Sequence, residues 1–237
     1  MTFVLSPPTV PSLAVAPGNN GDTNSRFPVR RVYCVGRNYA AHVREMGFDP
    51  DREPPFFFQK PADSIVVAAA GHAAQLSYPP CTSEYHFEIE LVVAIGTAGR
   101  NISVERANDH IWGYAVGLDM TRRDLQIDAR NKGRPWELGK SFDQSAPVSL
   151  LHPAASVGHP SSGEIWLQVD GQDRQRSDLA NLVWSVPEIV ANLSTYFELQ
   201  PGDLIFTGTP EGIGPVQRNE VMRGGIAGLT DIEVRVI

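Results

Sequence analysis

The chain has 237 residues, 42% of them hydrophobic and 20% charged, and a formal net charge of −7 at pH 7. A chain of this length can bury one substantial core, with room for a small appendage. The acidic balance argues against a nucleic-acid-binding surface, and the lack of a long apolar run argues against a membrane span. Two cysteines make no disulfide framework, and the N-terminus lacks the basic and apolar regions of a signal peptide, so we expect a cytoplasmic protein.

The first 26 residues differ in composition from the rest of the chain. They are rich in proline, and the run over residues 18–25 is polar and typical of turns. We therefore expect an N-terminal arm with a mobile loop over residues 1–26 and a single domain over residues 27–237. The 19 prolines and 21 glycines of the whole chain indicate many turns, and hence a fold built from short strands and shaped loops.

Residues 29–35 indicate a strand that Gly36 ends, and a short helix is expected over residues 38–46. His42 and Glu45 are three residues apart and would lie on one face of that helix. A carboxylate that orients a histidine is the usual form of a general base, because it fixes the tautomer and stabilises the imidazolium. A charged pair on a surface helix would leave the same pattern, so both interpretations stay open.

Residues 85–96 indicate the central strand, and residues 56–60 indicate a shorter aromatic strand that ends in Lys60; a core strand with an exposed terminal lysine is the simplest interpretation, and we favour it for the phenylalanines. Because side chains alternate along a strand, His86, Glu88 and Glu90 should share one face. The apolar run after Glu90 predicts that the strand enters a core that covers both of its faces.

Glu88 and Glu90 need a partner if this end of the strand is buried, because an unpaired buried carboxylate is strongly destabilising. No basic residue lies within the stretch, so a divalent metal would balance them; two solvated surface glutamates are the alternative. The apolar strand over residues 111–118 delivers Asp119 in a similar setting. Three carboxylates without a cysteine favour Mg²⁺, Mn²⁺ or Ca²⁺ over zinc.

Two later segments have the chemistry to meet an anion. Lys140 stands between two small residues, where it would reach a negatively charged group or remain a solvated loop residue. The Gly- and Pro-rich loop over residues 207–215 offers backbone N–H groups and the hydroxyls of Thr207 and Thr209, which suits a carboxylate or an oxyanion.

The remaining pattern completes a strand-rich chain. Residues 101–110 and 186–196 indicate helices, residues 121–126 a turn or short helix, and residues 131–139 a polar loop. Asp170-Gly171 is a strong signal for a two-residue turn, so residues 164–176 predict a β-hairpin.

Five motifs in this order resemble those of the fumarylacetoacetate hydrolase superfamily. They are VGRNY at residues 35–39 with His42 and Glu45, HFEIE at 86–90, GLDMT at 117–121 with Arg123 and Gln126, GKSFD at 139–143, and TGTP at 207–210. The first of them resembles the acylpyruvase branch, and residues 27–60 are most similar to bacterial enzymes that hydrolyse fumarylpyruvate in gentisate breakdown. Residues 1–26 lie outside the shared pattern.

The resemblance implies an α+β, strand-rich fold: a mixed β-sandwich or roll of the family's C-terminal-domain type with short peripheral helices, usually as a homodimer. It implies a Mg²⁺ or Mn²⁺ cofactor, with Ca²⁺ as a possible substitute in crystals. The roles it implies are metal ligands for Glu88, Glu90 and Asp119, catalytic residues for His42, Glu45 and Lys140, and substrate-binding residues for Arg37, Arg123, Gln126 and Thr209.

The activity implied by the resemblance is hydrolysis of a C–C bond in an acylpyruvate, a 2,4-diketo acid, with fumarylpyruvate as the first candidate substrate. An oxaloacetate decarboxylase or a keto–enol isomerase on the same scaffold is the nearest alternative. A non-catalytic β-rich module with a structural metal is an alternative of another class, which would leave His42, Lys140 and the Thr209 loop without a role.

Overall fold

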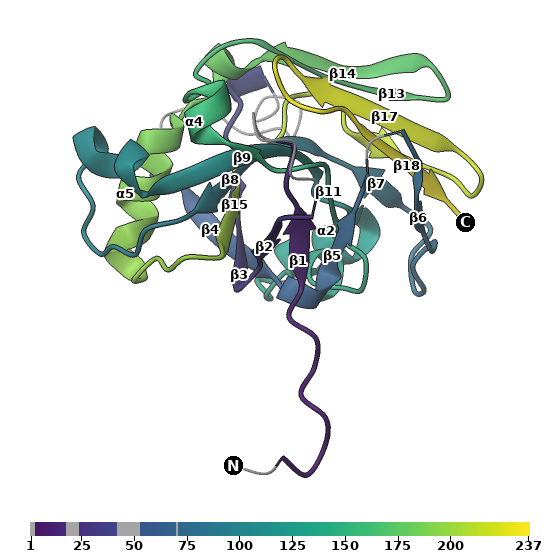
Figure 1. Ribbon diagram of the computed structural model, residues 1–237. Helices are drawn as coiled ribbons and strands as arrows, with labels where there is room; N and C mark the ends of the chain where they lie inside the picture. The colour runs from purple at the N-terminus through teal and green to yellow at the C-terminus, as the bar shows by residue number, and fades with distance from the viewer. Residues whose placement is uncertain (1–2, 18–23, 42–52, 70) are drawn as a thin grey trace.

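A large mixed β-sheet and a smaller sheet that lies across it form the body of the protein, and the N-terminal segment projects from this body (Figure 1). The computed structural model describes residues 3–17, 24–41, 53–69 and 71–237. The larger sheet runs in the order β4 (Phe56–Lys60), β3 (Arg31–Gly36), β15 (Asp203–Phe206), β8 (Ile89–Ile95), β9 (Ile111–Leu118), β11 (Ala146–Val148) and β5 (Ile65–Val67), with β12 (His152–Pro153) also paired to β9. The smaller sheet runs in the order β14 (Gln172–Asp178), β13 (Glu164–Val169), β17 (Val221–Ile226), β18 (Ile232–Val236) and β6 (Ala74–Leu76).

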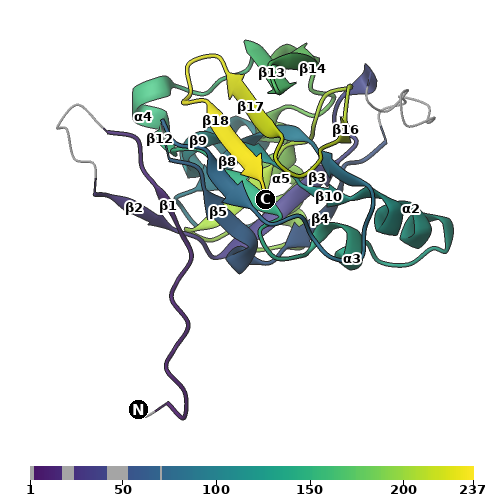
Figure 2. The ribbon, with the colours of Figure 1, turned by 90° about the vertical axis from the view of Figure 1, so that its right-hand side faces the viewer.

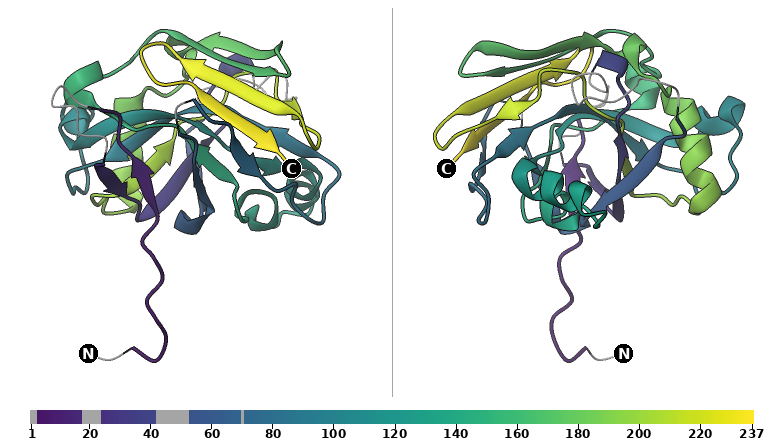
Figure 3. Two further views of the ribbon diagram at one scale, coloured as in Figure 1. Left: turned by 45° about the vertical axis from the view of Figure 1, so that its right-hand side comes forward. Right: turned by 180° about the vertical axis from the view of Figure 1, so that it is seen from behind.

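Short elements complete the fold. A three-stranded sheet joins β10 (Thr121–Arg122), β7 (Tyr85–Phe87) and β16 (Gly214–Pro215), and β1 (Ser12–Ala14) pairs with β2 (Arg26–Pro28). The helices that the structure describes in full are α2 (Arg123–Asn131), α3 (Glu137–Lys140), α4 (Ala154–Val157) and α5 (Val186–Tyr196), with 3-10 turns η1 (Ala62–Ser64), η2 (Val104–His110) and η3 (Leu179–Asn181). Helices α2 and α3 lie together on one side of the sheets, away from α5 (Figures 2 and 3). This strand-rich α+β architecture confirms the predicted fold class.

Strand β8 is buried on both faces, as its apolar sequence predicts. Leu91 and Val93 belong to the core cluster that includes residues of the smaller sheet, whereas Val92 and Ala94 belong to a second cluster on the opposite side. Each fully buried aliphatic side chain contributes about 1.5–3 kcal/mol. The strand that delivers Glu90 is therefore held firmly from both sides.

The prediction of one continuous strand over residues 85–96 is wrong at Glu88. β7 ends at Phe87 and lies in the three-stranded sheet, while β8 begins at Ile89 in the large sheet. The Ile89 N–H donates to the side chain of Gln175 at 3.0 Å instead of to a neighbouring strand. The His86 ring lies 3.0 Å from the Glu84 carboxylate.

Other local predictions met mixed outcomes. The hairpin is confirmed: Asp170 and Gly171 both have positive φ, 48° and 77°, which suits a two-residue turn between β13 and β14. Helix α5 is confirmed, and its Ser185 N–H is capped by Glu188 at 2.9 Å. Residues 101–110 form only the 3-10 turn η2, and the loop expected over residues 131–139 contains the start of α3.

The N-terminal segment has an anchored part and a projecting part. Leu13 is buried, and the backbone N–H of Ala16 donates to Leu151 at 2.9 Å. Phe3, Val4 and Leu5 are exposed at the end of the projecting part (Figures 1 and 2). Within the described ranges, no helix is long and apolar enough to cross a membrane.

Candidate active site

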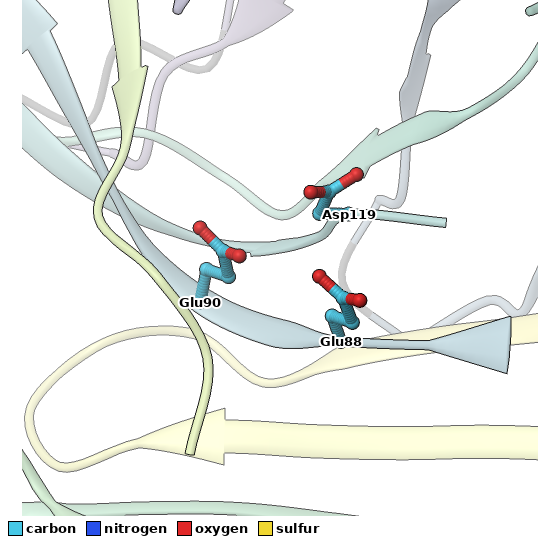
Figure 4. A group of neighbouring side chains, drawn as sticks. All are labelled: Glu88, Glu90 and Asp119. Carbon is cyan, nitrogen blue, oxygen red and sulfur yellow. The ribbon is translucent and has the colours of Figure 1, made fainter. Parts of the chain in front are cut away.

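Three carboxylates converge where β8 begins and β9 ends. Ile89 and Glu90 pair with Leu118 and Gly117 across the two antiparallel strands, and the Asp119 N–H donates to the Glu88 carbonyl at 2.8 Å. This register places Glu88, Glu90 and Asp119 side by side. All three are buried, and one oxygen atom of each lies within 4.8 Å of those of the other two (Figure 4).

Basic residues from three distant segments reach this cluster, although the central stretch itself has none. Lys140 Nζ lies 2.8 Å from Glu88 Oε2 and 2.7 Å from Asp119 Oδ2. Lys60 Nζ lies 2.8 Å from Asp119 Oδ1, and the Arg123 guanidinium pairs with Glu88 Oε1. Two of the carboxylates are thus balanced by protein cations.

Lys60 is buried, which excludes the interpretation that it is an exposed residue at the end of a core strand. Its ammonium donates to the carbonyls of Met120 at 3.0 Å and Lys140 at 2.5 Å, besides its ion pair with Asp119. These contacts satisfy the charge inside the core. A lysine at the end of an aromatic strand gives no sign of this role, because its partners come from residues 60 to 80 positions further along the chain.

Lys140 lies at the end of α3 and is almost fully buried, so it is no solvated loop residue. Burial alone would lower the pKa of its ammonium, but the charges of Asp119 and Glu88 outweigh that effect and raise the pKa above its ordinary value. Lys140 therefore stays protonated and serves as a fixed positive charge and hydrogen-bond donor.

Glu90 differs from the other two carboxylates, because no lysine or arginine of the described segments lies within ion-pair distance of it. Its Oε2 accepts the Gly208 N–H at 2.7 Å. Burial, together with the charges of Asp119 and Glu88, raises the pKa of Glu90 well above its usual value. An all-oxygen set with one unpaired buried carboxylate fits a hard divalent cation such as Mg²⁺ or Mn²⁺.

The Gly-rich loop after β15 donates a backbone hydrogen bond to a carboxylate of the protein itself. The Gly208 N–H, expected to be offered to a ligand, is occupied by Glu90. Gly208 has φ +99°, and a Cβ there would lie 2.6 Å from the Asn38 side chain, so both the turn and the close approach require glycine. Thr209 follows with its Oγ1 accepting from Gln175 Nε2 at 2.8 Å.

The carboxylates open into a pocket with about 530 Å³ of empty space, solvent at its mouth included. The predicted site residues that line it are Arg37, Glu88, Glu90, Arg123, Gln126, Lys140 and Thr209. Asp119 joins them through the carboxylate cluster. His42 and Glu45, the predicted base and its partner, lie outside the described residues.

Residues 31–237 match the family model of the fumarylacetoacetate hydrolase C-terminal domain. The chain belongs to this family. A crystal structure of fumarylpyruvate hydrolase from Pseudomonas aeruginosa, in complex with Mn²⁺ and pyruvate, is 60% identical in sequence, covers 100% of this chain and 99% of that one, and superposes with a TM-score of 0.96.

Two further relatives point to different reactions on the same scaffold. Fumarylpyruvate hydrolase from a Ralstonia species is 46% identical over 188 residues, which is 79% of this chain and 95% of that protein. Mitochondrial oxaloacetate tautomerase from Bos taurus is 40% identical over 207 residues, which is 87% of this chain and 91% of that protein.

In this member of the family, sequence reasoning identified only the first half of the pocket wall that α2 forms. Helix α2 was expected to stop near residue 126, yet it runs to Asn131, and Ile127 and Arg130 line the pocket beside Arg123 and Gln126. These positions follow the i, i+3, i+4, i+7 spacing of one helix face. That spacing is visible in the sequence and could have extended the prediction. Gln175 gave no such signal, since it is the one buried side chain in the polar run of β14.

Proposed function

We propose that the protein is a metal-dependent hydrolase of acylpyruvates that cleaves fumarylpyruvate to fumarate and pyruvate. The observation that carries the proposal is the buried carboxylate cluster at the pocket, with Glu90 lacking a basic partner among the described residues. The 60% identity to a fumarylpyruvate hydrolase in complex with Mn²⁺ and pyruvate supports both the metal and the substrate class.

Glu88, Glu90 and Asp119 would hold Mg²⁺ or Mn²⁺, with Ca²⁺ as a substitute. When bound, such an ion acts as a Lewis acid for the negative charge that develops on the pyruvate half as the C–C bond breaks. The surrounding Lys140, Lys60 and Arg123 would orient the carboxylates, because each is already fixed by an ion pair inside the protein.

Thr209, Arg123 and Gln126 would position the 2-oxo acid end of the substrate. The Thr209 hydroxyl accepts a hydrogen bond from Gln175, which leaves its own proton for donation to a substrate oxygen. Gln126 Oε1 accepts from Arg123 at 2.5 Å, so its amide NH₂ group remains to donate. Lys140 would stabilise the oxygen of the attacked carbonyl by its positive charge, because its three N–H groups already donate to Glu88, Asp119 and Thr121.

His42, oriented by Glu45, is our proposed general base: it would take a proton from water so that the hydroxide attacks the carbonyl distal to the pyruvate end. The pair lies outside the described residues, and the proposal rests on their spacing and on the family resemblance. Replacing His42 by alanine should lower the rate roughly 10²–10⁴-fold while metal binding persists. Near-full activity of that variant would remove His42 from the mechanism.

Keto–enol isomerisation or decarboxylation of oxaloacetate is the second candidate, because relatives that are 37–40% identical carry the names oxaloacetate tautomerase and oxaloacetate decarboxylase. Neither reaction needs attack by hydroxide. A homodimer remains a prediction from the family resemblance. A cytoplasmic location and the division of the chain at residue 26 remain predictions from the sequence.

The deciding experiment follows the ultraviolet absorbance of enolised fumarylpyruvate in the presence of Mg²⁺, Mn²⁺ or a chelator, with acetylpyruvate and oxaloacetate in parallel. We expect rapid, metal-dependent loss of fumarylpyruvate and equal yields of fumarate and pyruvate. Turnover confined to oxaloacetate would replace the hydrolase proposal by the isomerase or decarboxylase. A metal that stabilises the fold without turnover of any substrate would favour the structural-metal alternative.

A further inference from the structure

We propose that Gln175 is a positioning residue of the active site, which holds the Thr209 hydroxyl so that this group can only donate to a bound ligand. The inference deepens the proposed function and rests on it, because it takes Thr209 to meet the 2-oxo acid end of the substrate. Thr209 lines the pocket and Gln175 does not, so Gln175 would act through Thr209. The ligand atom at Thr209 must then be a hydrogen-bond acceptor, such as a carboxylate or keto oxygen.

Gln175 occupies a core-facing position in a strand of polar residues. It lies on β14 opposite Leu167 of β13, and paired residues of neighbouring strands point to the same face of the sheet. Leu167 belongs to the larger core cluster, and Gln175 is only 1% exposed. An amide in such a position is unfavourable unless its hydrogen bonds are made, whereas an aliphatic side chain would need none. The partners of the amide therefore explain its presence.

The Gln175 amide contacts two segments that border the pocket. Its Oε1 accepts the backbone N–H of Ile89 at 3.0 Å, at the start of the strand that carries Glu90. Its Nε2 donates to Thr209 Oγ1 and to the Pro210 carbonyl, each at 2.8 Å. Both N–H groups and the oxygen of the amide are thus engaged, which leaves the side chain a single orientation.

The backbone partners fix which end of the amide faces Thr209. The Ile89 N–H can only donate, so it requires the amide oxygen, and the Pro210 carbonyl can only accept, so it requires the NH₂ group. Turning the amide over would place donor against donor and acceptor against acceptor. Thr209 Oγ1 lies beside the NH₂ group and must therefore accept from it.

This hydrogen bond leaves the Thr209 hydroxyl one role towards a ligand. Its oxygen is engaged by Gln175, so its proton is available to donate into the pocket that Glu88 and Glu90 also line. Thr209 is 3% exposed, so little water competes for that proton. A hydroxyl that is oriented before binding loses less freedom when the ligand arrives, and such pre-organisation strengthens binding.

A double-mutant cycle on ligand binding separates positioning from a purely structural role. Calorimetry on the full chain with Mn²⁺ measures the affinity for pyruvate, so the result does not depend on hydrolysis. Thr209→Val keeps the shape of the side chain but removes the hydroxyl, and Gln175→Met keeps the length but removes the amide. We expect each to weaken pyruvate binding about 3- to 10-fold, and the double variant to bind no more weakly than Thr209→Val alone.

Thr209→Ser is the conservative counterpart, because it keeps the hydroxyl. In that background Gln175→Met should again weaken pyruvate binding about 3- to 10-fold. Gln172→Met is the matched control and should leave the affinity unchanged, since Gln172 lies on the same strand, is exposed and does not line the pocket. A loss from Gln175→Met that is equal in the native and Thr209→Val backgrounds would overturn the inference.

Binding of Mn²⁺ without pyruvate shows whether the effect is confined to the ligand. Gln175→Met should keep its affinity for Mn²⁺ within about threefold, because Thr209 is no ligand of the metal in this proposal. A loss of Mn²⁺ binding as large as the loss of pyruvate binding would place the role of Gln175 at the carboxylates and overturn the inference.

Gln175→Glu is the second variant, should Gln175→Met fail to fold. Its carboxylate still accepts the Ile89 N–H and would also accept from the Thr209 hydroxyl, which would turn that proton away from the pocket. It should therefore weaken pyruvate binding more in the native background than in Thr209→Val. An equal loss in the two backgrounds would count against Gln175 as a positioning residue.

Hydrolysis gives a separate readout. The kcat/KM for fumarylpyruvate should fall in Gln175→Met by the same factor as the affinity for pyruvate. Coupling between Gln175 and Thr209 in pyruvate binding, without cleavage of any acylpyruvate, would disprove the proposed hydrolase and leave the inference standing. Cleavage of fumarylpyruvate without that coupling would do the reverse. A native protein that binds no pyruvate with Mn²⁺ would also overturn the inference, since Thr209 would have no 2-oxo acid to meet.

Discussion

The two ends of the pocket differ in how deeply their side chains are buried and in how their charges are held. At the inner end, Glu88, Glu90 and Asp119 are buried with Lys60 and Lys140, and every charge is fixed by contacts inside the protein. The outer end is the part of the pocket lined by Arg37, Phe56, Arg130 and Trp136, which are only partly buried.

This difference predicts which end of the pocket carries out the reaction and which end selects the substrate. Charges in a buried site interact strongly because little water screens them, so they can stabilise a reacting group at low reorganisation cost. Charges at a half-exposed rim are screened and act mainly on recognition. Substitutions at the inner end should therefore change the rate and the stability, and substitutions at the outer end should change the choice of substrate.

Replacing Glu90 by glutamine should have the largest effect on activity. The amide keeps the size of the side chain but removes the carboxylate that lacks a basic partner, so we expect a loss on the order of 10²–10³-fold in kcat. Added Mn²⁺ should also raise the melting temperature of the Glu90→Gln variant less than that of the native protein, as measured by calorimetry.

The same variant tests whether burial of Glu90 is costly. Because its pKa is raised in the folded protein, the folded state holds a proton that the unfolded chain releases, and the metal-free protein should lose stability as pH rises above the ordinary carboxyl pKa of 4.5. Glu90→Gln should remove that loss in urea unfolding between pH 5 and pH 8. A metal-free variant with the native pH slope would show that Glu90 is stabilised in another way.

Lys140→Met should give the largest loss of stability. It leaves Glu88 and Asp119 short of a buried cation, and breaking such a pair costs about 3–5 kcal/mol. Urea unfolding without metal measures the loss, and Mn²⁺ should recover part of it. Lys60→Met is the matched variant, since it removes a single ion pair to Asp119. An unchanged free energy of unfolding in Lys140→Met would contradict the description of the inner end as a balanced charge cluster.

The inner end was largely predictable from sequence, whereas at the outer end only Arg37 was predicted. Glu88, Glu90 and Asp119 stand at the ends of apolar strands, where burial alone makes a carboxylate conspicuous. The roles of Lys60 and Gln175 could not be predicted from the sequence, because they depend on contacts with residues 60 to 86 positions away in the chain. The break at Glu88 was missed for the same reason: the pattern over residues 85–96 is continuous, and the Gln175 side chain that ends it comes from the other sheet.

Trp136→Leu should produce a moderate effect confined to recognition. The ring packs edge-on against Phe56 and at 5.8 Å from the ring of Phe58, so its loss should raise KM for fumarylpyruvate about 2- to 10-fold and leave kcat within a factor of about two. Trp166→Leu, outside the pocket on β13, is the control. A fall in kcat without a change in KM would contradict the division between the two ends.

We expect the smallest effect from a substitution at His152, outside the pocket. It tests whether the loss of stability at low pH comes partly from groups that are not in the pocket. It lies on β12, and its Nε2 accepts the Thr230 N–H at 3.0 Å, which requires the neutral ring. Burial lowers the pKa of His152 below 6.5, so the folded state binds fewer protons than the unfolded chain. Its contribution to stability is complete above pH 6.5 and is lost as pH falls through the lowered pKa. Replacing His152 by glutamine should therefore reduce the change in unfolding free energy between pH 7 and pH 5, by less than about 1 kcal/mol.

The control for His152 is His72→Gln, at an exposed position. Activity at pH 7 should stay the same in both variants, since neither residue lines the pocket. If His152→Gln instead shifted the pH dependence of kcat/KM, the strand that carries it would be coupled to the active site. β12 pairs with β9, the strand that delivers Asp119. Such a shift would therefore mean that protonation of His152 affects the inner end of the pocket through the large sheet.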